Sequence, residues 1–364
     1  MIPIYEPDLS DLEFRYLCEA FKSGWISSKG PFMDRFEEAF TSFIGHPNQG
    51  VSVSNGTVAL HLALLASDVK PGDEILVPNF TYVASANAIR YVNATPVFFG
   101  SDAFDLQPSV TSARAAITER TRAIILPHLY GCAADIYGFS KLAEESGLLL
   151  IEDCAESIGT TIDGKHLGLW GNISTFSFFG NKTMTTGEGG MVFARDSAIE
   201  NKIRILKNQG LSQSGNYFHE ALGYNYRMTN LQAAIGCAQV ERLETILDKK
   251  NQNHHLYRNY LKNSSTVRLL EPVRGVSSYW METVILEDSK QRDKVRHALE
   301  AKGIETRPGF TDMTNLSFYA HSKKSSVGIY GLGESLINLP SGSKLTERQI
   351  ELVTEALKES LANL

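Results

Sequence analysis

Short apolar runs alternate with helix-like stretches over the first two thirds of the chain, and this alternation limits the fold more than any other feature of the sequence. Alternating strands and helices are typical of an α/β layered sheet. The runs that we expect to form strands are 51–53, 74–77, 96–99, 123–127, 148–151, 174–179 and 190–194. Helices are expected over the apolar stretch 58–66 and over 85–91 and 196–208.

The length of 364 residues exceeds what one hydrophobic core usually serves, so we expect one large and one smaller domain. A long helix is predicted over 228–249, and the charged, Asn-rich stretch KKNQNHHLYRNYLKN after it is expected to lead into the smaller domain. The predicted large domain is 10–249 and the smaller one 250–364, with residues 1–9 packing on the smaller one. In the smaller domain we expect a strand at 278–286 and helices at 292–302 and 346–362.

Composition excludes several classes of function. The chain has 35 Lys and Arg against 41 Asp and Glu, a net charge of −6, and it lacks the basic stripe of a nucleic-acid-binding protein. No apolar run approaches the roughly 20 residues that a membrane helix needs. The four cysteines form no C-x-x-C pair, so we expect no metal site and no disulfide framework but reduced thiols in the cytoplasm.

Carboxylates follow directly after the predicted strand that ends in LLLI. They are Glu152, Asp153 and Glu156 in the run EDCAE. Residues that follow a strand lie at its carboxyl end, and ligands bind at this edge of open α/β sheets. A lone Asp at this place is more often a helix N-cap, so its interpretation depends on the signals below.

Lys182 lies in an aromatic and Gly-rich loop, STFSFFGNKTMTTGEGG. Lysines are almost never fully buried without a partner. A desolvated lysine has a lowered pKa and reacts as a nucleophile with carbonyl groups. Most loop lysines are simply solvated, so Lys182 also needs support from elsewhere in the sequence.

That support comes from the segment Ser54-Asn55-Gly56-Thr57, which joins a predicted strand to a predicted helix. Backbone N–H groups at a helix N-terminus bind phosphate, and glycine allows a close approach. The same residues also make an ordinary turn and cap. Together, a phosphate cradle, a carboxylate and a carbonyl-reactive lysine are what pyridoxal 5'-phosphate (PLP) requires for its phosphate, its pyridine nitrogen and its aldehyde.

Seven motifs distributed over nearly the whole chain resemble those of one family. They are GWISSKG, VSVSNGTVALHLAL, VPNFTYVAS, PHLYG, IEDCAES, STFSFFGNKTMTTGEGGM and GYNYRMTNLQAAIG. The sequence resembles the DegT/DnrJ/EryC1/StrS sugar-nucleotide aminotransferases. The resemblance implies the aspartate-aminotransferase-like fold type I of PLP enzymes, with a large mixed-sheet domain and a smaller α/β domain.

The resemblance also implies a role for each matching residue. Lys182 would bond covalently to the cofactor and later move the proton, and Asp153 would pair with the pyridine nitrogen. The remaining cofactor contacts would be Glu156 near the ring hydroxyl, Ala155 and Tyr82 on the two ring faces, and Gly56, Thr57 and Ser177 at the phosphate. Asn225 would reach the phosphate of the partner subunit, which implies a homodimer with shared active sites.

The implied reaction is the amination of a 4-keto-6-deoxy sugar on a nucleoside diphosphate, with L-glutamate as donor and surface polysaccharide as destination. A GDP sugar is favoured over a UDP or dTDP sugar, and Arg227 and Arg307 are candidates for binding the diphosphate. One segment departs from the family. Relatives commonly carry an aromatic-Pro-x-His pattern after the Thr-Arg-Pro motif, whereas this chain has Asp312 and Thr314 at the Pro and His positions.

Three alternatives remain open. A PLP-dependent sugar dehydratase would carry His where this chain has Lys182. A nucleotide-cofactor oxidoreductase would need G-x-G-x-x-G after an early strand, and the sequence lacks it. A non-catalytic binding protein on the same fold would lose Lys182 or Asp153, and both are present.

Overall fold

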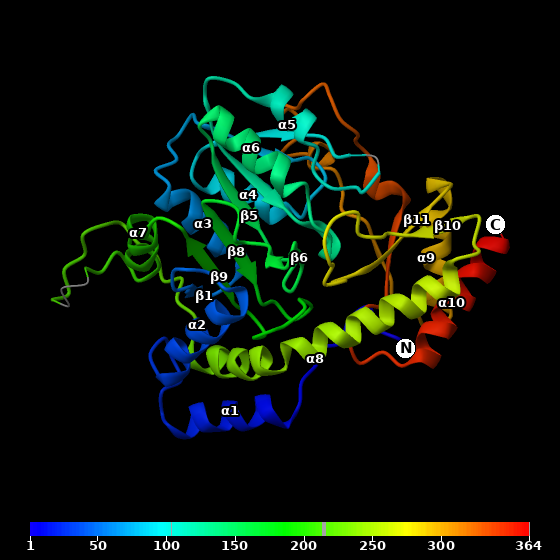
Figure 1. Ribbon diagram of the computed structural model, residues 1–364, viewed down its shortest axis with the longest axis horizontal. Coiled ribbons are helices and arrows are strands. Elements are labelled where there is room, and N and C mark those ends of the chain that lie inside the picture. Colours follow the sequence, from blue (N-terminus) through cyan, green and yellow to red (C-terminus); the bar gives the residue numbers. More distant parts are fainter. Residues whose placement is uncertain (103, 213–215, 364) are drawn as a thin grey trace.

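The computed structural model describes residues 1–102, 104–212 and 216–363. Within these residues, seven strands form a mixed sheet in the order β1-β9-β8-β5-β4-β2-β3 (Figure 1). In that order the strands are Val51–Val53, Gly190–Ala194, Ile173–Ser177, Leu149–Asp153, Thr121–Pro127, Glu74–Pro78 and Thr95–Phe99. The predicted α/β sheet is therefore confirmed, with each strand end within two residues of its predicted position.

Pairing within the sheet gathers most carboxyl ends at one edge. The pairs β2–β3, β2–β4, β4–β5 and β5–β8 are parallel. Strand β9 is antiparallel to both β8 and β1, so β1 runs in the same direction as β8 and β5. The loops that follow β1, β2, β5 and β8 therefore start from the same edge of the sheet, where ligands bind in open α/β folds.

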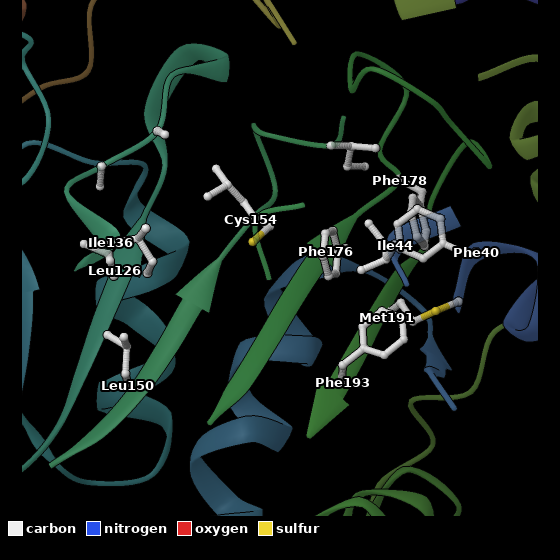
Figure 2. Close-up of a cluster of buried hydrophobic side chains, with 14 of the residues drawn as sticks. Phe40, Ile44, Leu126, Ile136, Leu150, Cys154, Phe176, Phe178, Met191 and Phe193 are labelled. Carbon is white, nitrogen blue, oxygen red and sulfur yellow. The ribbon is translucent and has the colours of Figure 1, made fainter. Parts of the chain in front are cut away.

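Helices cover both faces of this sheet and bury an apolar core on each side. Helices α2, α5, α6 and part of α8 pack on one face, and α3, α4 and α7 pack on the other. Figure 2 shows part of the first core, where the Phe40 ring lies 5.0 Å from that of Phe178 in an edge-on contact. The helices are α1 Asp11–Lys22, α2 Pro31–Ile44, α3 Gly56–Ala66, α4 Val83–Tyr91, α5 Val110–Ala116, α6 Ile136–Ser146 and α7 Ser197–Lys207.

Helix α8, Asn230–Leu261, is longer than the sequence pattern indicated. The stretch that we expected to lead into the smaller domain continues the helix to Leu261. Its buried residues Lys250, Asn253, His254 and Tyr257 have helical spacing. Most of them are polar, so a search for apolar periodicity does not detect this face of the helix. The predicted boundary between residues 249 and 250 lies inside this helix, and the division into two domains there stays a proposal.

A second sheet lies at the far end of α8, as Figure 1 shows. Its antiparallel strands follow the order β10-β11-β13-β12 and span Val267–Leu269, Glu282–Leu286, Leu336–Leu339 and Arg307–Pro308. Helices α9 (Arg292–Ala301) and α10 (Glu347–Ala362) pack on it. The N-terminus also contacts this region, because the N–H of Ile2 donates to the carbonyl of Gly303 at 2.8 Å.

One predicted strand is shorter than expected. Residues 278–286 were expected to be extended throughout, but β11 begins at Glu282 because Tyr279 adopts φ +47°, which breaks an extended chain. The remaining elements are the hairpin β6–β7 (Thr161–Ile162 and Lys165–His166) and the 3₁₀ turns η1 Leu129–Gly131, η2 Ser289–Gln291, η3 Met313–Asn315 and η4 Leu332–Ser335. Among the described helices, none has the length and apolar character needed to cross a bilayer.

Candidate active site

A cavity of about 480 Å³ lies at the carboxyl edge of the main sheet, between it and the second sheet. The loops after β1, β2, β5 and β8 and the segment around β12 contribute its walls. The predicted site residues that line it are Gly56, Thr57, Tyr82, Asp153, Ala155, Glu156, Ser177, Lys182 and Arg307.

The turn between β1 and α3 forms one end of the cavity. Asn55 caps α3, since its Oδ1 accepts the N–H of Val58 at 3.0 Å. The N–H groups of Gly56 and Thr57 belong to the first helical turn, which has no preceding turn to bond. Glycine is needed here, because a Cβ on Gly56 would lie 2.7 Å from the Cβ of Ser177. The Ser177 hydroxyl and the helix N-terminus together make a cradle that suits a phosphate.

Asp153, the last residue of β5, faces the cavity with both carboxylate oxygens engaged. Its Oδ2 accepts the hydroxyl of Ser85 at 2.7 Å, and its Oδ1 accepts the N–H of Ala155 at 3.2 Å. Asp153 is 7% exposed. A buried carboxylate held in this way presents its remaining lone pairs in a fixed direction.

Lys182 lies in the loop between β8 and β9, and its side chain is only 11% exposed. Two hydrogen bonds hold this part of the loop. The Tyr5 hydroxyl donates to the carbonyl of Lys182 at 2.6 Å, and the Trp280 indole N–H donates to the carbonyl of Asn181 at 2.7 Å. The Nζ atom of Lys182 lies 4.1 Å from the centre of the Trp280 ring. The lysine is therefore positioned by residues that are far from it in sequence, one before it and one after it.

Electrostatics couple Lys182 to Glu156, whose Oε1 lies 4.0 Å from Nζ. Burial lowers the pKa of Lys182, although the nearby charges of Glu156 and Asp153 oppose this. Burial raises the pKa of Glu156 to about 7, opposed by Lys182 and by the N–H of Tyr130, which donates to Oε2 at 3.0 Å. Both shifts favour an amine that is neutral more often than a solvated lysine, which suits attack on a carbonyl.

Aromatic rings form another part of the cavity wall. Tyr82 is the N-cap residue of α4 and is 55% exposed, and the centroid of its ring lies 5.9 Å from that of Phe310. Phe310 stacks in turn on the buried ring of Tyr130 at 5.1 Å. Tyr130 adopts φ +57°, an unusual conformation for a large residue, at the turn after β4. The wall offers a flat face to a planar ligand.

Of the three remaining predicted site residues, only Arg307 lines the cavity among the described residues. Arg307 is at the cavity wall, half-exposed, with Nη2 3.9 Å from Glu305 Oε1. Asn225 and Arg227 do not line this cavity among the described residues. They contact each other, since Nε and Nη2 of Arg227 donate to Asn225 Oδ1 at 3.1 and 3.0 Å.

Asp312 and Thr314, the two positions that depart from the family pattern, also lie outside the described lining of the cavity. Asp312 is buried, and its Oδ2 accepts the N–H of Gly331 at 2.8 Å. The N–H of Thr314 donates to Asn79 Oδ1 at 3.0 Å. The contact with Asn79 ties Thr314 to the loop after β2, which also carries Tyr82.

His128 and Glu152 are structural at this edge. The two side chains meet at 3.2 Å, and His128 Nδ1 accepts the N–H of Ala134 at 3.2 Å. Glu152 also accepts N–H groups from Gly168, Trp170 and Gly171. All of these groups therefore have hydrogen-bond partners within the fold.

Sequence reasoning missed several residues that shape the site. Ser85, Trp280 and Tyr5 were not singled out, although they bond to Asp153, Asn181 and Lys182 respectively. Ser85 follows Tyr82 by three positions, so the helical spacing was a usable signal. Trp280 and Tyr5 are far from Lys182 in sequence, and no local pattern connects them.

Comparison with known proteins gives a consistent result. Residues 7–358 match the family described as the DegT/DnrJ/EryC1/StrS aminotransferase family. The chain is 43% identical over 364 residues to GDP-perosamine synthase from Vibrio cholerae, covering 98% of each. It is 42% identical over 359 residues to GDP-perosamine synthase from Escherichia coli O157:H7, again covering 98% of each. The solved aminotransferase TlmJ from Streptoalloteichus hindustanus is similar with a TM-score of 0.93 and 29% identity, covering 100% of this chain and 99% of that one.

Proposed function

The chain belongs to the DegT/DnrJ/EryC1/StrS family of PLP-dependent sugar aminotransferases, and from this premise we propose that it aminates C4 of GDP-4-keto-6-deoxymannose to form GDP-perosamine. L-Glutamate is the proposed donor, and 2-oxoglutarate the second product. The similarity to two GDP-perosamine synthases over 98% of the chain is the observation that carries the GDP sugar.

The residues of the cavity fit PLP. The cradle of Gly56, Thr57 and Ser177 suits its phosphate, and a side chain at position 56 would fill the space that Ser177 approaches. Asp153 is proposed to face the pyridine nitrogen, with Ala155 on one ring face and Tyr82 on the other. When bound, PLP supplies an aldehyde that accepts the amino group and a pyridinium ring that withdraws electrons from the reacting carbon.

Lys182 and Asp153 are the proposed catalytic residues. Lys182 would hold the cofactor through its Nζ atom and, once released, would carry the proton between the reacting carbons. Its buried position beside Glu156 keeps a neutral amine accessible for this role. Asp153 would keep the ring nitrogen protonated, and Glu156 would bond to the ring hydroxyl. The presence of Lys182 disfavours a sugar dehydratase, which would carry His there.

A homodimer with shared sites is part of the proposal. Asn225 is exposed and lies outside the cavity of its own chain among the described residues, which supports a contact with the cofactor phosphate of a neighbour. Arg307 and the partner subunit's Arg227 are proposed to bind the substrate diphosphate, because a guanidinium group can donate two hydrogen bonds to phosphate oxygens. A cytoplasmic location and a role in O-antigen synthesis complete the proposal.

The test is a panel of GDP-, UDP- and dTDP-linked 4-keto-6-deoxy sugars with L-glutamate as donor. We expect the GDP sugar to give the highest kcat/KM by more than about tenfold, a difference of about 1.4 kcal/mol in transition-state binding. A UDP or dTDP sugar that wins by the same margin would overturn the GDP assignment and leave the PLP chemistry intact. Turnover confined to free amino acids and keto acids would overturn the sugar substrate altogether.

A further inference from the structure

Ser85 makes a direct contact with the carboxylate that the proposed function pairs with the cofactor ring. Its hydroxyl donates to Asp153 Oδ2 at 2.7 Å. Ser85 is 1% exposed and Asp153 is 7% exposed, so bulk water does not compete freely for this bond. The bond is therefore a fixed part of the carboxylate's surroundings.

The same helical turn also places the ring-stacking residue. Ser85 lies in the first turn of α4, and its N–H donates to the carbonyl of Tyr82, the N-cap of that helix, at 3.3 Å. Tyr82 lines the cavity, and Ser85 bonds to Asp153, which lines the same cavity. One turn of helix thus links the proposed partner of the ring face to the proposed partner of the ring nitrogen.

The chemistry of a shared proton gives this contact a consequence. A buried carboxylate and a pyridine nitrogen compete for one proton, and a donor to the carboxylate stabilises its ionised form. Without the Ser85 hydroxyl, Asp153 would keep one donor, the N–H of Ala155 at 3.2 Å, and would bind the shared proton more strongly.

We infer that Ser85 is a positioning residue that orients Asp153 and keeps the shared proton on the pyridine nitrogen of the bound cofactor. This inference rests on the proposed function, because it takes Asp153 as the partner of the ring. A hydroxyl that only satisfied helix packing would have no influence on the protonation of the ring.

The test uses holoenzyme reconstituted with PLP that carries ¹⁵N in its ring. The ¹⁵N chemical shift reports directly whether the nitrogen is protonated. We expect the wild type and Ser85→Thr, which keeps a hydroxyl, to show a protonated nitrogen at neutral pH. In Ser85→Ala the shift should move toward that of the unprotonated ring, and kcat should fall roughly tenfold with KM for the nucleotide sugar nearly unchanged.

Two further variants make the outcome decisive. Ser360→Ala removes a buried hydroxyl from α10, where it donates to the carbonyl of Ala356 at 2.7 Å, and should match the wild type in shift and rate. Ser85→Cys keeps the size of serine with a much weaker donor, so it carries the test if the alanine variant fails to fold. A wild-type shift in both Ser85→Ala and Ser85→Cys would overturn the role of Ser85. An unprotonated nitrogen in the wild type itself would instead overturn the pairing of Asp153 with the ring, and the role of Ser85 with it.

Discussion

The Nζ atom of Lys182 lies 4.0 Å from Oε1 of Glu156, and both side chains are largely buried beside Asp153. Two acids and one amine in a poorly solvated cavity cannot all carry their usual charges at low cost. Burial lowers the pKa of the lysine and raises that of Glu156 to about 7. Glu156 therefore changes its charge near neutral pH, where the enzyme is expected to work.

This pair predicts a pH-dependent difference in stability between the cofactor-free wild type and Glu156→Gln. The pKa of Glu156 is raised from 4.5 to about 7 in the folded state. The contribution of Glu156 to the free energy of unfolding is therefore complete below about pH 4.5 and is lost as the pH rises through about 7. The free energy of unfolding of the wild type relative to the variant should therefore fall between pH 5.5 and 8.5, on the order of 2 kcal/mol. Loss of the glutamate also lowers the pKa of Lys182 further, so the free energy of unfolding of the variant rises more with pH. This effect also makes the wild type less stable relative to the variant as the pH rises.

Urea denaturation of both cofactor-free proteins at several pH values measures this difference. A difference that stays constant across that range would mean that Glu156 does not titrate there. The cofactor-free form is the right sample, because a bound ligand would add its own pH dependence.

Replacement of Lys182 by Ala should reduce kcat by at least about 10³-fold, because the nucleophile and the proton carrier are lost together. The circular dichroism spectrum should stay that of the wild type, since the side chain lies in a loop between β8 and β9. Lys141→Ala, at a lysine that is 74% exposed, is the matched control and should retain full activity. Near-normal turnover of Lys182→Ala would remove the lysine from the mechanism.

Shared active sites predict that two inactive proteins restore activity when their subunits exchange. In a heterodimer of Lys182→Ala with Asn225→Asp, one site carries both defects and the other carries neither, if Asn225 acts on the partner subunit. Activity should rise to as much as half of the wild-type value per heterodimer. Exchange that is verified by mass spectrometry without recovery of activity would place Asn225 in the site of its own chain.

A side chain at position 56 should weaken cofactor binding. The Cβ of Gly56→Ala would lie 2.7 Å from the Cβ of Ser177, so the cradle must open to accommodate it. We expect Kd for PLP to rise roughly tenfold or more, the equivalent of about 1.4 kcal/mol. Gly180→Ala is the control, because a Cβ there meets no atom within 4 Å. Equal affinities of the two variants, measured by fluorescence titration, would contradict the cradle.

Much of this fold follows from local sequence patterns. The apolar runs of the main sheet are short, bounded by turn residues and separated by helical stretches, so their strands were predictable to within two residues. Asp153, Gly56 and Lys182 were predictable as neighbours, because each follows a strand of the main sheet and the relevant carboxyl ends share one edge. Strands that run in the same direction bring the loops at their carboxyl ends to one edge of the sheet, and this does not depend on how the side chains pack.

Other features depend on contacts that local patterns do not encode. The buried face of the C-terminal half of α8 consists of Lys250, Asn253, His254 and Tyr257. Most of these side chains are polar, so the sequence pattern alone indicates a linker and not a buried helix. Lys250, for example, donates to the carbonyls of Trp280 and Ser341. The late start of β11 depends on the positive φ of Tyr279. The hydrogen bonds that Tyr5 and Trp280 make to the loop of Lys182 connect residues that are far apart in sequence.

The fate of the donor nitrogen is the most direct test of the proposed transfer of an amino group from L-glutamate to C4 of the sugar. Holoenzyme is incubated with GDP-4-keto-6-deoxymannose and ¹⁵N-labelled L-glutamate, and the nucleotide-sugar product is examined by mass spectrometry and NMR. We expect one ¹⁵N atom bonded to C4 of the sugar, with one equivalent of 2-oxoglutarate formed for each sugar converted. A nucleotide sugar without ¹⁵N, or with the label on another carbon, would contradict it.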